Sequence, residues 1–390
     1  MRMSPAAGQI IEKADPLTQA AHEGRDWLLN HAAPLWAPSP RAAGQLFPER
    51  MSIDGVNDEC PRRLFVQARH VYSYCEIGRM GWSGPWRDYV EGGVDLLLSK
   101  GRRPDGLYIH KFAPDGGVFD SRADLYDQAF MLLALACAGA ATRRADLFEA
   151  AEALDDALEA HWRSPHGGYD EGEIAACPPF RQNPHMHMLE AFIALHGASG
   201  AERWRRRAEQ VFALCARFFV DRDSGALLEY FDGALTPLAG AAGRVAEPGH
   251  GLEWAWLFEI AAPWLGAEAI GLSDRLVRFA RRFGLDPERN VVINETSKDG
   301  GALNRDARLW PQSERLKTAL ARFRRTGEAT ERDEALSAYQ GLMKYLDVPK
   351  RGAWRDKLRA DGGWIVEPAP GSSLYHIVCA LAELRRTVGL

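Results

Sequence analysis

The 390-residue chain carries 48 lysines and arginines against 53 aspartates and glutamates, a formal net charge of −5, and 46% of its residues are hydrophobic. Its charges are interspersed, whereas a nucleic-acid-binding protein gathers positive charge on one surface, so that class is excluded. The longest apolar run, residues 129–141, is too short to span a bilayer, and residues 1–15 lack a signal-peptide core, so a soluble, cytoplasmic protein without membrane contact is predicted.

Apolar residues recur at the 3.6-residue spacing of a helix in nine windows. In chain order these windows are residues 125–141, 146–161, 187–196, 201–219, 252–265, 273–283, 312–324, 331–345 and 373–387. Strand-like alternation is nearly absent from the sequence. The chain is therefore predicted to be all-α.

Short segments with glycine, aspartate and aromatic residues separate the predicted helix pairs. These are residues 104–117, 164–172, 223–233, 298–310 and 360–368. Gly-Gly and Asp-Gly supply the positive φ of tight turns, so short loops or β-hairpins are expected there. They recur every roughly 55 to 75 residues, which is the length of a helical hairpin repeat. Five or six such units form a helical array.

Polar residues inside apolar helical sequence are the strongest sign of a site, and they are Arg69, His187, His250, Glu253, Glu314 and His376. Because burying an unpaired charge costs roughly several kcal/mol, such residues are expected to converge on a cavity. Residues from different repeats meet at one site only if the repeats surround a common axis. We therefore predict an (α/α)6 barrel with short β-hairpin loops. It forms a single domain over residues 21–390, preceded by a frayed N-terminus at residues 1–20.

The segment from Asn183 to Glu190 has the pattern of a helix start, with Asn183 as its cap and proline in its first turn. His185 and His187 are two positions apart and point to different helix faces, which is poor geometry for joint metal binding. His187 is expected at the site or bonded to buried backbone with equal weight. For His185 the buried structural role is favoured.

His250 and Glu253 stand three residues apart at the start of an apolar helix. At this spacing a carboxylate can reach the imidazole, fix its tautomer and raise its pKa, as a general base near neutral pH requires. A capping role for Glu253 is the alternative. The catalytic role is favoured.

Three further candidates have structural alternatives. His376 alone fits a core histidine, and Arg69 needs an acceptor that is either a substrate oxygen or a protein carboxylate. Glu314 lies in a first helical turn after Trp310, where it could compensate the helix dipole. However, the chain contains 12 tryptophans, and aromatic faces with Arg, Glu, Asn and His make up a carbohydrate pocket.

Motifs for other chemistries are missing from the sequence, including GxSxG, a P-loop, a dinucleotide GxGxxG, HExxH and paired-cysteine metal spacing. Neither a cofactor nor a metal is therefore predicted. A pair of carboxylates acting as in a glycosidase stays open, but the histidine-rich set fits that chemistry less well.

These motifs together resemble the N-acylglucosamine 2-epimerase superfamily over about residues 60–385. The resemblance rests on ARHVYSY, NPHMHMLEAFIAL, EPGHGLEWAWLF, WPQSERLKTAL and LYHIV. It implies an (α/α)6 barrel that is a sugar epimerase or aldose-ketose isomerase. It further implies that His250 and His376 transfer protons with Glu253 as partner of His250. Substrate binding falls to Arg69, His187, Trp310, Glu314 and Asn183.

Among these activities we favour isomerisation of D-mannose to D-fructose through an enediol. Cellobiose epimerases carry a second Trp where this chain has Leu309, which argues against a disaccharide. The alternative is an N-acylglucosamine 2-epimerase or other sugar 2-epimerase. Lesser alternatives are a non-catalytic sugar-binding barrel and a sugar-phosphate isomerase that uses Arg181, Arg305 or Arg308. The partner is a small-molecule sugar, and a homodimer is compatible with the sequence.

Overall fold

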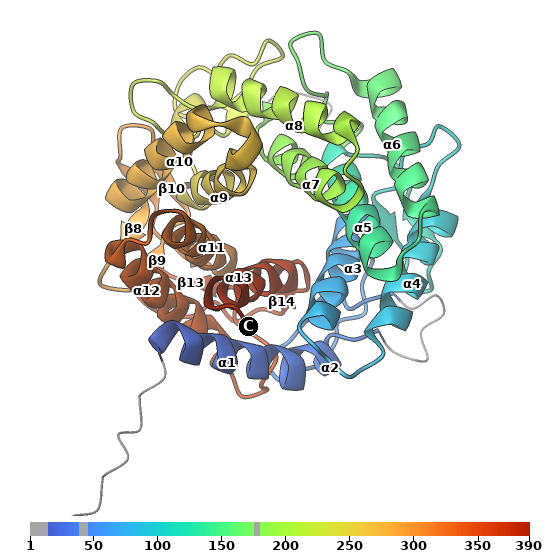
Figure 1. Ribbon diagram of the computed structural model, residues 1–390, viewed down its shortest axis with the longest axis horizontal. Coiled ribbons are helices and arrows are strands. Elements are labelled where there is room, and N and C mark those ends of the chain that lie inside the picture. Colours follow the sequence, from blue (N-terminus) through green and yellow to red (C-terminus); the bar gives the residue numbers. More distant parts are fainter. Residues whose placement is uncertain (1–14, 39–45, 175–179) are drawn as a thin grey trace, which may run out of the picture.

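The computed structural model describes residues 15–38, 46–174 and 180–390, and helices dominate it. Figure 1 shows the helices arranged as two concentric rings. The helices are α1 (Pro16–Trp27), α2 (Ala33–Leu35), α3 (Leu64–Arg79), α4 (Trp86–Leu96), α5 (Leu125–Thr142), α6 (Asp146–Trp162), α7 (Asn183–Ser199), α8 (Glu202–Leu214), α9 (Pro248–Leu265), α10 (Ala267–Phe279), α11 (Leu309–Thr326), α12 (Ala329–Leu346) and α13 (Ser372–Val388).

The inner ring consists of α3, α5, α7, α9, α11 and α13, each packed against the next, and α13 closes the ring on α3. Each inner helix also packs against an outer one: α4, α6, α8, α10 and α12 cover the first five, and α1 covers α13. The predicted (α/α)6 barrel is confirmed.

Hydrophobic patterning explains which helices lie inside. The inner helix α5 is apolar on all sides, as a helix surrounded by protein should be. It is long and apolar enough to cross a membrane, but 83% of that window is buried inside the ring. The outer helix α8 instead buries one stripe, formed by Trp204, Ala208, Val211 and Phe212. Its other face is polar and meets solvent.

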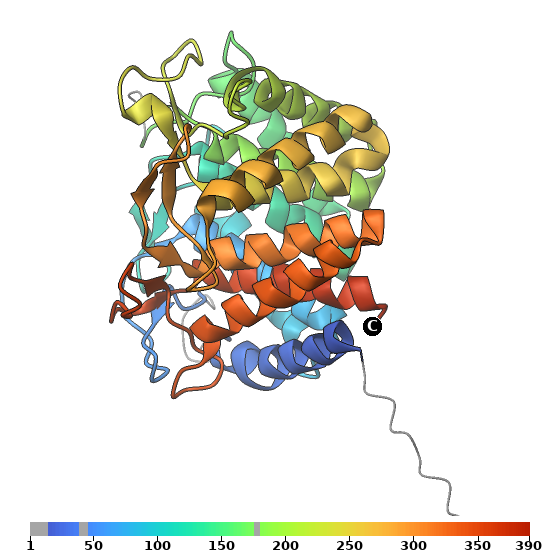
Figure 2. The ribbon, with the colours of Figure 1, turned by 90° about the vertical axis from the view of Figure 1, so that its left-hand side faces the viewer.

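Short antiparallel strands gather at one end of the ring (Figure 2). They are β1 (Arg50–Met51), β2 (Arg62–Arg63), β3 (Lys111–Phe112), β4 (Val118–Asp120), β5 (Phe180–Arg181), β6 (Tyr230–Phe231), β7 (Val245–Ala246), β8 (Leu285–Asp286), β9 (Val291–Val292), β10 (Glu295–Ser297), β11 (Ala302–Asn304), β12 (Ala307–Arg308), β13 (Lys357–Leu358) and β14 (Ala369–Pro370). Strands β2, β5, β7, β12 and β14 lead directly into inner helices. The inner helices therefore begin at this end.

Two parts of the helix prediction need correction. Residues 16–20, which we expected to fray, form the first turns of α1, because the Asp15 side chain accepts a hydrogen bond from the Thr18 N–H at 3.2 Å and Leu17 is buried. Helices α1 to α4 were not among the predicted windows, which begin at residue 125. The expectation for residues 1–14 falls outside the described residues.

Glutamine side chains anchor three inner helices to the loops that precede them. Each side chain accepts a hydrogen bond at Oε1 from a backbone N–H at 2.8 Å and donates one from Nε2 to the C=O of the same residue at 3.0–3.2 Å. The anchored residue always lies 20 positions earlier. The pairs are Gln67 with Phe47, Gln128 with Tyr108, and Gln312 with Val292.

Replacing Gln128 with leucine should leave the buried N–H and C=O of Tyr108 without these partners. We expect the free energy of unfolding to fall by about 2–4 kcal/mol, since each unsatisfied buried group costs about 1–3 kcal/mol. Urea denaturation followed by circular dichroism measures this change. The control Gln210→Leu, on the exposed face of α8, should change it by less than about 0.5 kcal/mol. Equal effects would show that the anchor does not stabilise the ring.

Candidate functional site

A cavity of about 320 Å³ opens at the N-terminal end of the inner ring. The first turns of the inner helices and the loops before them supply its wall. The lining residues are Arg63, Phe65, Arg69, Tyr126, Asn183, His187, Glu247, His250, Glu253, Arg308, Trp310, Asp356, Lys357, Pro370, Ser372, Ser373 and His376. Seven of the eight predicted site residues line this cavity.

The position of the cavity has an electrostatic consequence. The N-terminus of a helix carries the positive end of its dipole and free backbone N–H groups. Because six helices begin around one cavity, their dipoles favour negative charge inside it. An oxyanion that develops on a ligand would be stabilised there.

His250 lies in the first turn of α9 and is paired with a glutamate from a preceding loop. Its Nδ1 is 3.0 and 3.1 Å from the two carboxylate oxygens of Glu229, and 3.9 Å from Glu247. Burial opposes the charged imidazole, but these two carboxylates outweigh it and raise the pKa of His250 to about 9. His250 is therefore protonated at neutral pH. We expected Glu253 to be its partner, and the structure gives that place to Glu229.

His376, on α13, lies in a different electrostatic environment. Its Nδ1 is 2.7 Å from Oε1 of Glu314, which is fully buried. Burial lowers the pKa of His376 well below its ordinary value, and the cations Arg69 and Lys317 lower it further. His376 is therefore neutral at neutral pH. With Nδ1 bonded to Glu314, its Nε2 is left for the cavity.

Trp310 lies between the two histidines. Its ring centroid is 4.9 Å from that of His250 and 5.7 Å from that of His376. The indole therefore fixes the planes of both imidazoles while it lines the cavity itself.

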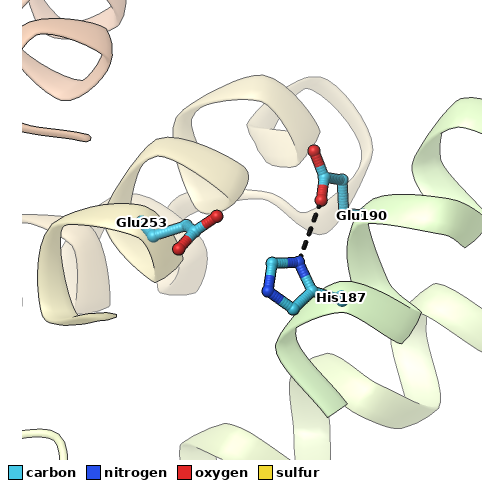
Figure 3. A group of neighbouring side chains, drawn as sticks. All are labelled: His187, Glu190 and Glu253. Carbon is cyan, nitrogen blue, oxygen red and sulfur yellow. Dashed lines mark hydrogen bonds and ion pairs between the residues drawn. The ribbon is translucent and has the colours of Figure 1, made fainter. Parts of the chain in front are cut away.

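The third histidine, His187, also has its own carboxylate. Its Nδ1 is 3.1 Å from Glu190 one turn along α7, and the other oxygen of Glu190 accepts a hydrogen bond from Tyr375. Burial lowers the pKa of His187. Figure 3 shows Glu253 approaching this pair from the neighbouring helix α9. The structure thus brings His187 to the cavity wall.

Arg69 reaches the cavity between aromatic rings. Its Nη2 donates a hydrogen bond to the Tyr126 hydroxyl at 2.7 Å, and its charge lies 4.1 Å from the Phe130 ring centroid and 4.9 Å from that of Tyr375. Across residues 15–38, 46–174 and 180–390, Arg69 forms no ion pair with a carboxylate. The guanidinium thus keeps hydrogen-bonding capacity for an oxygen in the cavity.

Three buried polar atoms around the cavity have no hydrogen-bond partner in the described part of the chain: Nε of Arg69, Oδ1 of Asn183 and Oε1 of Glu253. The predicted capping role of Asn183 is wrong, because α7 begins at Asn183 itself and its side chain makes no cap hydrogen bond. Each unpaired buried group costs roughly 1–3 kcal/mol, which a hydroxyl-rich ligand would recover.

Other predicted residues lie elsewhere. Glu314 stands behind His376, and Leu309 is fully buried away from the cavity. His185 accepts a hydrogen bond from the Tyr169 N–H at 3.1 Å in the core, which confirms its structural role. Arg181 and Arg305 do not line the cavity, whereas Arg308 does.

Several site residues were missed from the sequence, namely Arg63, Tyr126, Glu229, Glu247, Asp356, Lys357, Ser372 and Ser373. Most stand at the junction of a strand or loop with an inner helix. The sequence signal that could have found them is their place relative to the inner helices. Residues just before or inside the first turn of an inner helix lie at the same end of the ring.

Three groups of side chains place candidate metal-ligand atoms within 4.8 Å of one another: His187, Glu190 and Glu253; Glu229, Glu247 and His250; and Glu253, Glu314 and His376. In each group the histidine Nδ1 is already bonded to a carboxylate of the same group. Protein cations also lie at 2.6 Å from two of the carboxylates, Lys317 at Glu314 and Arg308 at Glu247. Such donor sets fit balanced hydrogen-bonded pairs, and we assign none of them as metal ligands.

A ring of helical hairpins, with paired histidines and carboxylates around a cavity that suits hydroxyls, has the features that a sugar isomerase or epimerase requires. The N-acylglucosamine 2-epimerase family model matches residues 48–380. This chain belongs to that family and is accordingly a sugar isomerase or epimerase.

The chain is also similar to individual proteins of known activity or structure. A mannose-6-phosphate isomerase from Rhizobium meliloti (strain 1021) is 39% identical over 374 residues, which cover 93% of this chain and 96% of that protein. A D-mannose isomerase from Thermobifida fusca is 29% identical over 67% of this chain and 69% of its own length. The solved structure of cellobiose 2-epimerase from Spirochaeta thermophila DSM 6192 superposes with a TM-score of 0.85 at 21% identity, covering 97% and 99% of the two chains, and supports the fold.

Replacing Glu229 with glutamine should lower the pKa of His250 from about 9 towards its ordinary value, because the nearest carboxylate is removed. NMR titration of the histidine Hε1 signals, assigned with His250→Asn, measures this pKa. The exposed Glu268→Gln serves as control and should leave it unchanged.

The same variant should show a pH-dependent loss of stability. The folded-state pKa of about 9 lies above the unfolded value of about 6.5, so the pair contributes fully below pH 6.5 and loses its contribution as the pH rises through 9. Glu229→Gln should therefore destabilise the fold more at about pH 6 than at about pH 10. A pH-independent loss would contradict the ion pair.

Proposed function

We propose that this protein is an aldose-ketose isomerase that interconverts D-mannose and D-fructose through an enediol. The observation that carries the proposal is the difference between two histidines on one cavity. His250, beside two carboxylates, holds a proton at neutral pH, whereas the buried His376 is neutral and, with Nδ1 bonded to Glu314, has Nε2 free. An acid and a base ready together are what this proton transfer needs.

The reaction proceeds on the open-chain sugar. Nε2 of His376 takes the proton from C2, while His250 donates a proton to the carbonyl oxygen O1, which gives the neutral enediol. His376 then returns its proton to C1, and His250 regains a proton from the O2 hydroxyl as the C2 carbonyl forms. Each histidine ends the cycle as it began, so no other reactant is consumed.

Substrate binding falls to the groups with spare hydrogen-bonding capacity. Arg69 donates to a sugar oxygen and stabilises charge that develops on it, together with the helix dipoles. Asn183 and the free oxygen of Glu253 accept hydrogen bonds from sugar hydroxyls. The Trp310 face packs against the sugar carbons, and His187 bonds a further hydroxyl. Glu314 acts through His376.

The unphosphorylated sugar is favoured by the charges at the cavity mouth. Three cations there lie close to glutamates: Arg63 at 2.5 Å from Glu49, Arg308 at 2.6 Å from Glu247, and Lys357 at 2.8 Å from Glu367. A phosphate would have to compete with these partners. The cavity of about 320 Å³ is at the small end of the range for ligand sites, which suits one sugar ring.

Mannose 6-phosphate must nevertheless be tested, because a relative that matches along nearly its whole length has that name. A 2-epimerase is the second candidate. It is favoured by the placement of His250 and His376 on different inner helices, since epimerisation returns the proton to C2 from the opposite face. The cytoplasmic location and the homodimer stay predictions from the sequence.

The substrate is identified by proton NMR of D-mannose, D-mannose 6-phosphate and N-acetyl-D-mannosamine, each incubated with the protein in D2O. Fructose from mannose is the expected product. An epimer with deuterium at C2 would establish the epimerase instead. Binding of a sugar without any exchange of its C2 hydrogen would support the alternative hypothesis of a non-catalytic sugar-binding barrel.

His376→Asn should lower kcat by about 10²–10⁴-fold, the usual contribution of a general base, while the fold persists by circular dichroism. The matched control is His161→Asn, on the exposed side of α6, which should retain full activity. Unchanged C2 exchange in His376→Asn would remove this residue from the mechanism.

A further inference from the structure

Three buried carboxylates from neighbouring inner helices form a layer at the cavity wall: Glu253 on α9, which lines the cavity, with Glu190 on α7 and Glu314 on α11 beside it. Within the described ranges, Lys317 is the one lysine that is buried, and it stands in this layer with no exposed surface. A fully buried ammonium is costly unless a carboxylate compensates it. Its place beside the proposed catalytic base therefore needs a physical reason.

Lys317 and Glu314 lie one turn apart on α11. The Lys317 Nζ is 2.6 Å from Oε2 of Glu314 and 3.7 Å from the ring centroid of Trp256. The other oxygen of Glu314 is 2.7 Å from Nδ1 of His376. The three side chains thus form a continuous chain from the buried layer to the cavity.

The charge of Glu314 is opposed by its surroundings. Burial and the carboxylate of Glu253 raise the pKa of Glu314 well above its ordinary value, although Lys317 lowers it. Burial also disfavours the ammonium, but Glu314 raises the pKa of Lys317 above its ordinary value. The contact with Lys317 at 2.6 Å is thus the interaction that favours the Glu314 carboxylate against burial and Glu253.

The protonation of Glu314 decides which nitrogen of His376 carries hydrogen. A carboxylate accepts the Nδ1–H and leaves Nε2 as the base. A carboxylic acid would instead donate to Nδ1, and the imidazole proton would move to Nε2. In that tautomer His376 has no lone pair available for a C2 proton.

We propose that Lys317 is a positioning residue that keeps Glu314 ionised and so holds His376 in the tautomer with a free Nε2. The kinetic consequence rests on the proposed isomerase function, whereas the tautomer is a property of the free protein. Lys317 does not line the cavity and has no contact with substrate in this role.

Other titratable groups lie near the row of side chains formed by Lys317, Glu314 and His376 and influence the protonation of these three residues. They come from α3, α7, α9 and α13 and are Arg69, His187, Glu190, His250, Glu253 and Cys379. Lys317 differs from the two other cations, Arg69 and the protonated His250, because it contacts Glu314 directly.

The tautomer is measured in the free protein by long-range ¹H–¹⁵N NMR of histidine rings, with His376 assigned by the His376→Asn spectrum. In the native protein at pH 7, His376 should carry hydrogen on Nδ1. In Lys317→Met it should carry hydrogen on Nε2, and the Nδ1 form should return as the pH is raised. Lys317→Arg, which keeps the charge, should retain the native tautomer.

Two results would overturn the proposal: an Nε2–H tautomer in the native protein, or an unchanged tautomer in Lys317→Met. If Lys317→Met does not fold, Lys317→Gln removes the charge with a polar side chain and carries the same expectation. The measurement on the native protein needs no variant of Lys317, only the His376→Asn spectrum for assignment.

Kinetics then test the consequence. Lys317→Met should lower kcat at pH 7 by about 10²-fold with KM changed less than about threefold, because the base is lost while the cavity is unchanged. Activity should recover at higher pH as Glu314 ionises, and Lys317→Arg should keep the native pH profile. A uniform loss at every pH would indicate a purely structural lysine. Native protein that shows the expected tautomer but converts no sugar would instead refute the proposed function.

Discussion

Closure of the inner ring is the constraint on which the rest of the structure depends. Six helices can surround one axis with all their N-termini at the same end only if an outer helix returns the chain between one inner helix and the next. This arrangement concentrates positive dipole ends and free backbone N–H groups around one cavity. Carboxylates and polar atoms that would be costly elsewhere in a core are stabilised there.

Around this cavity, the same pairing of a histidine with a glutamate occurs three times, but the protonation of the histidine differs. His187, His250 and His376 each have Nδ1 against a glutamate on the ring or its loops. Glu229 and Glu247 together overcome burial and make His250 a cation, whereas burial, with the cations Arg69 and Lys317, keeps His376 neutral. The protonation of each histidine is therefore set by burial together with the charges around it, because the glutamate at Nδ1 is common to all three. A single type of side chain can in this way supply both an acid and a base.

The sequence contained most of the fold and part of the site. Helical periodicity and the spacing of glycine-rich turns predicted the ring, but α3 was missed because buried polar residues such as Arg69, His70 and Ser73 interrupt its apolar pattern. His250 was found because it interrupts an apolar helix. Its partner Glu229 was not, since it lies in a turn segment 21 residues away, where an acid usually faces solvent. Lys317 likewise has the sequence context of an exposed helix face. Side-chain pairs that form only when the ring closes cannot be predicted from the local sequence pattern.

The ring also joins distant parts of the chain. Strand β1 pairs with β14, α3 packs against α13, and α1 covers α13. During synthesis, residues 16–79 therefore emerge from the ribosome long before the helix that completes their environment. Apolar surface on α1 and α3 stays uncovered until residues 369–388 have been made, and it is exposed to aggregation meanwhile. The geometry that collects the site at one axis thus makes the nascent chain a natural client for chaperones until its last helix arrives.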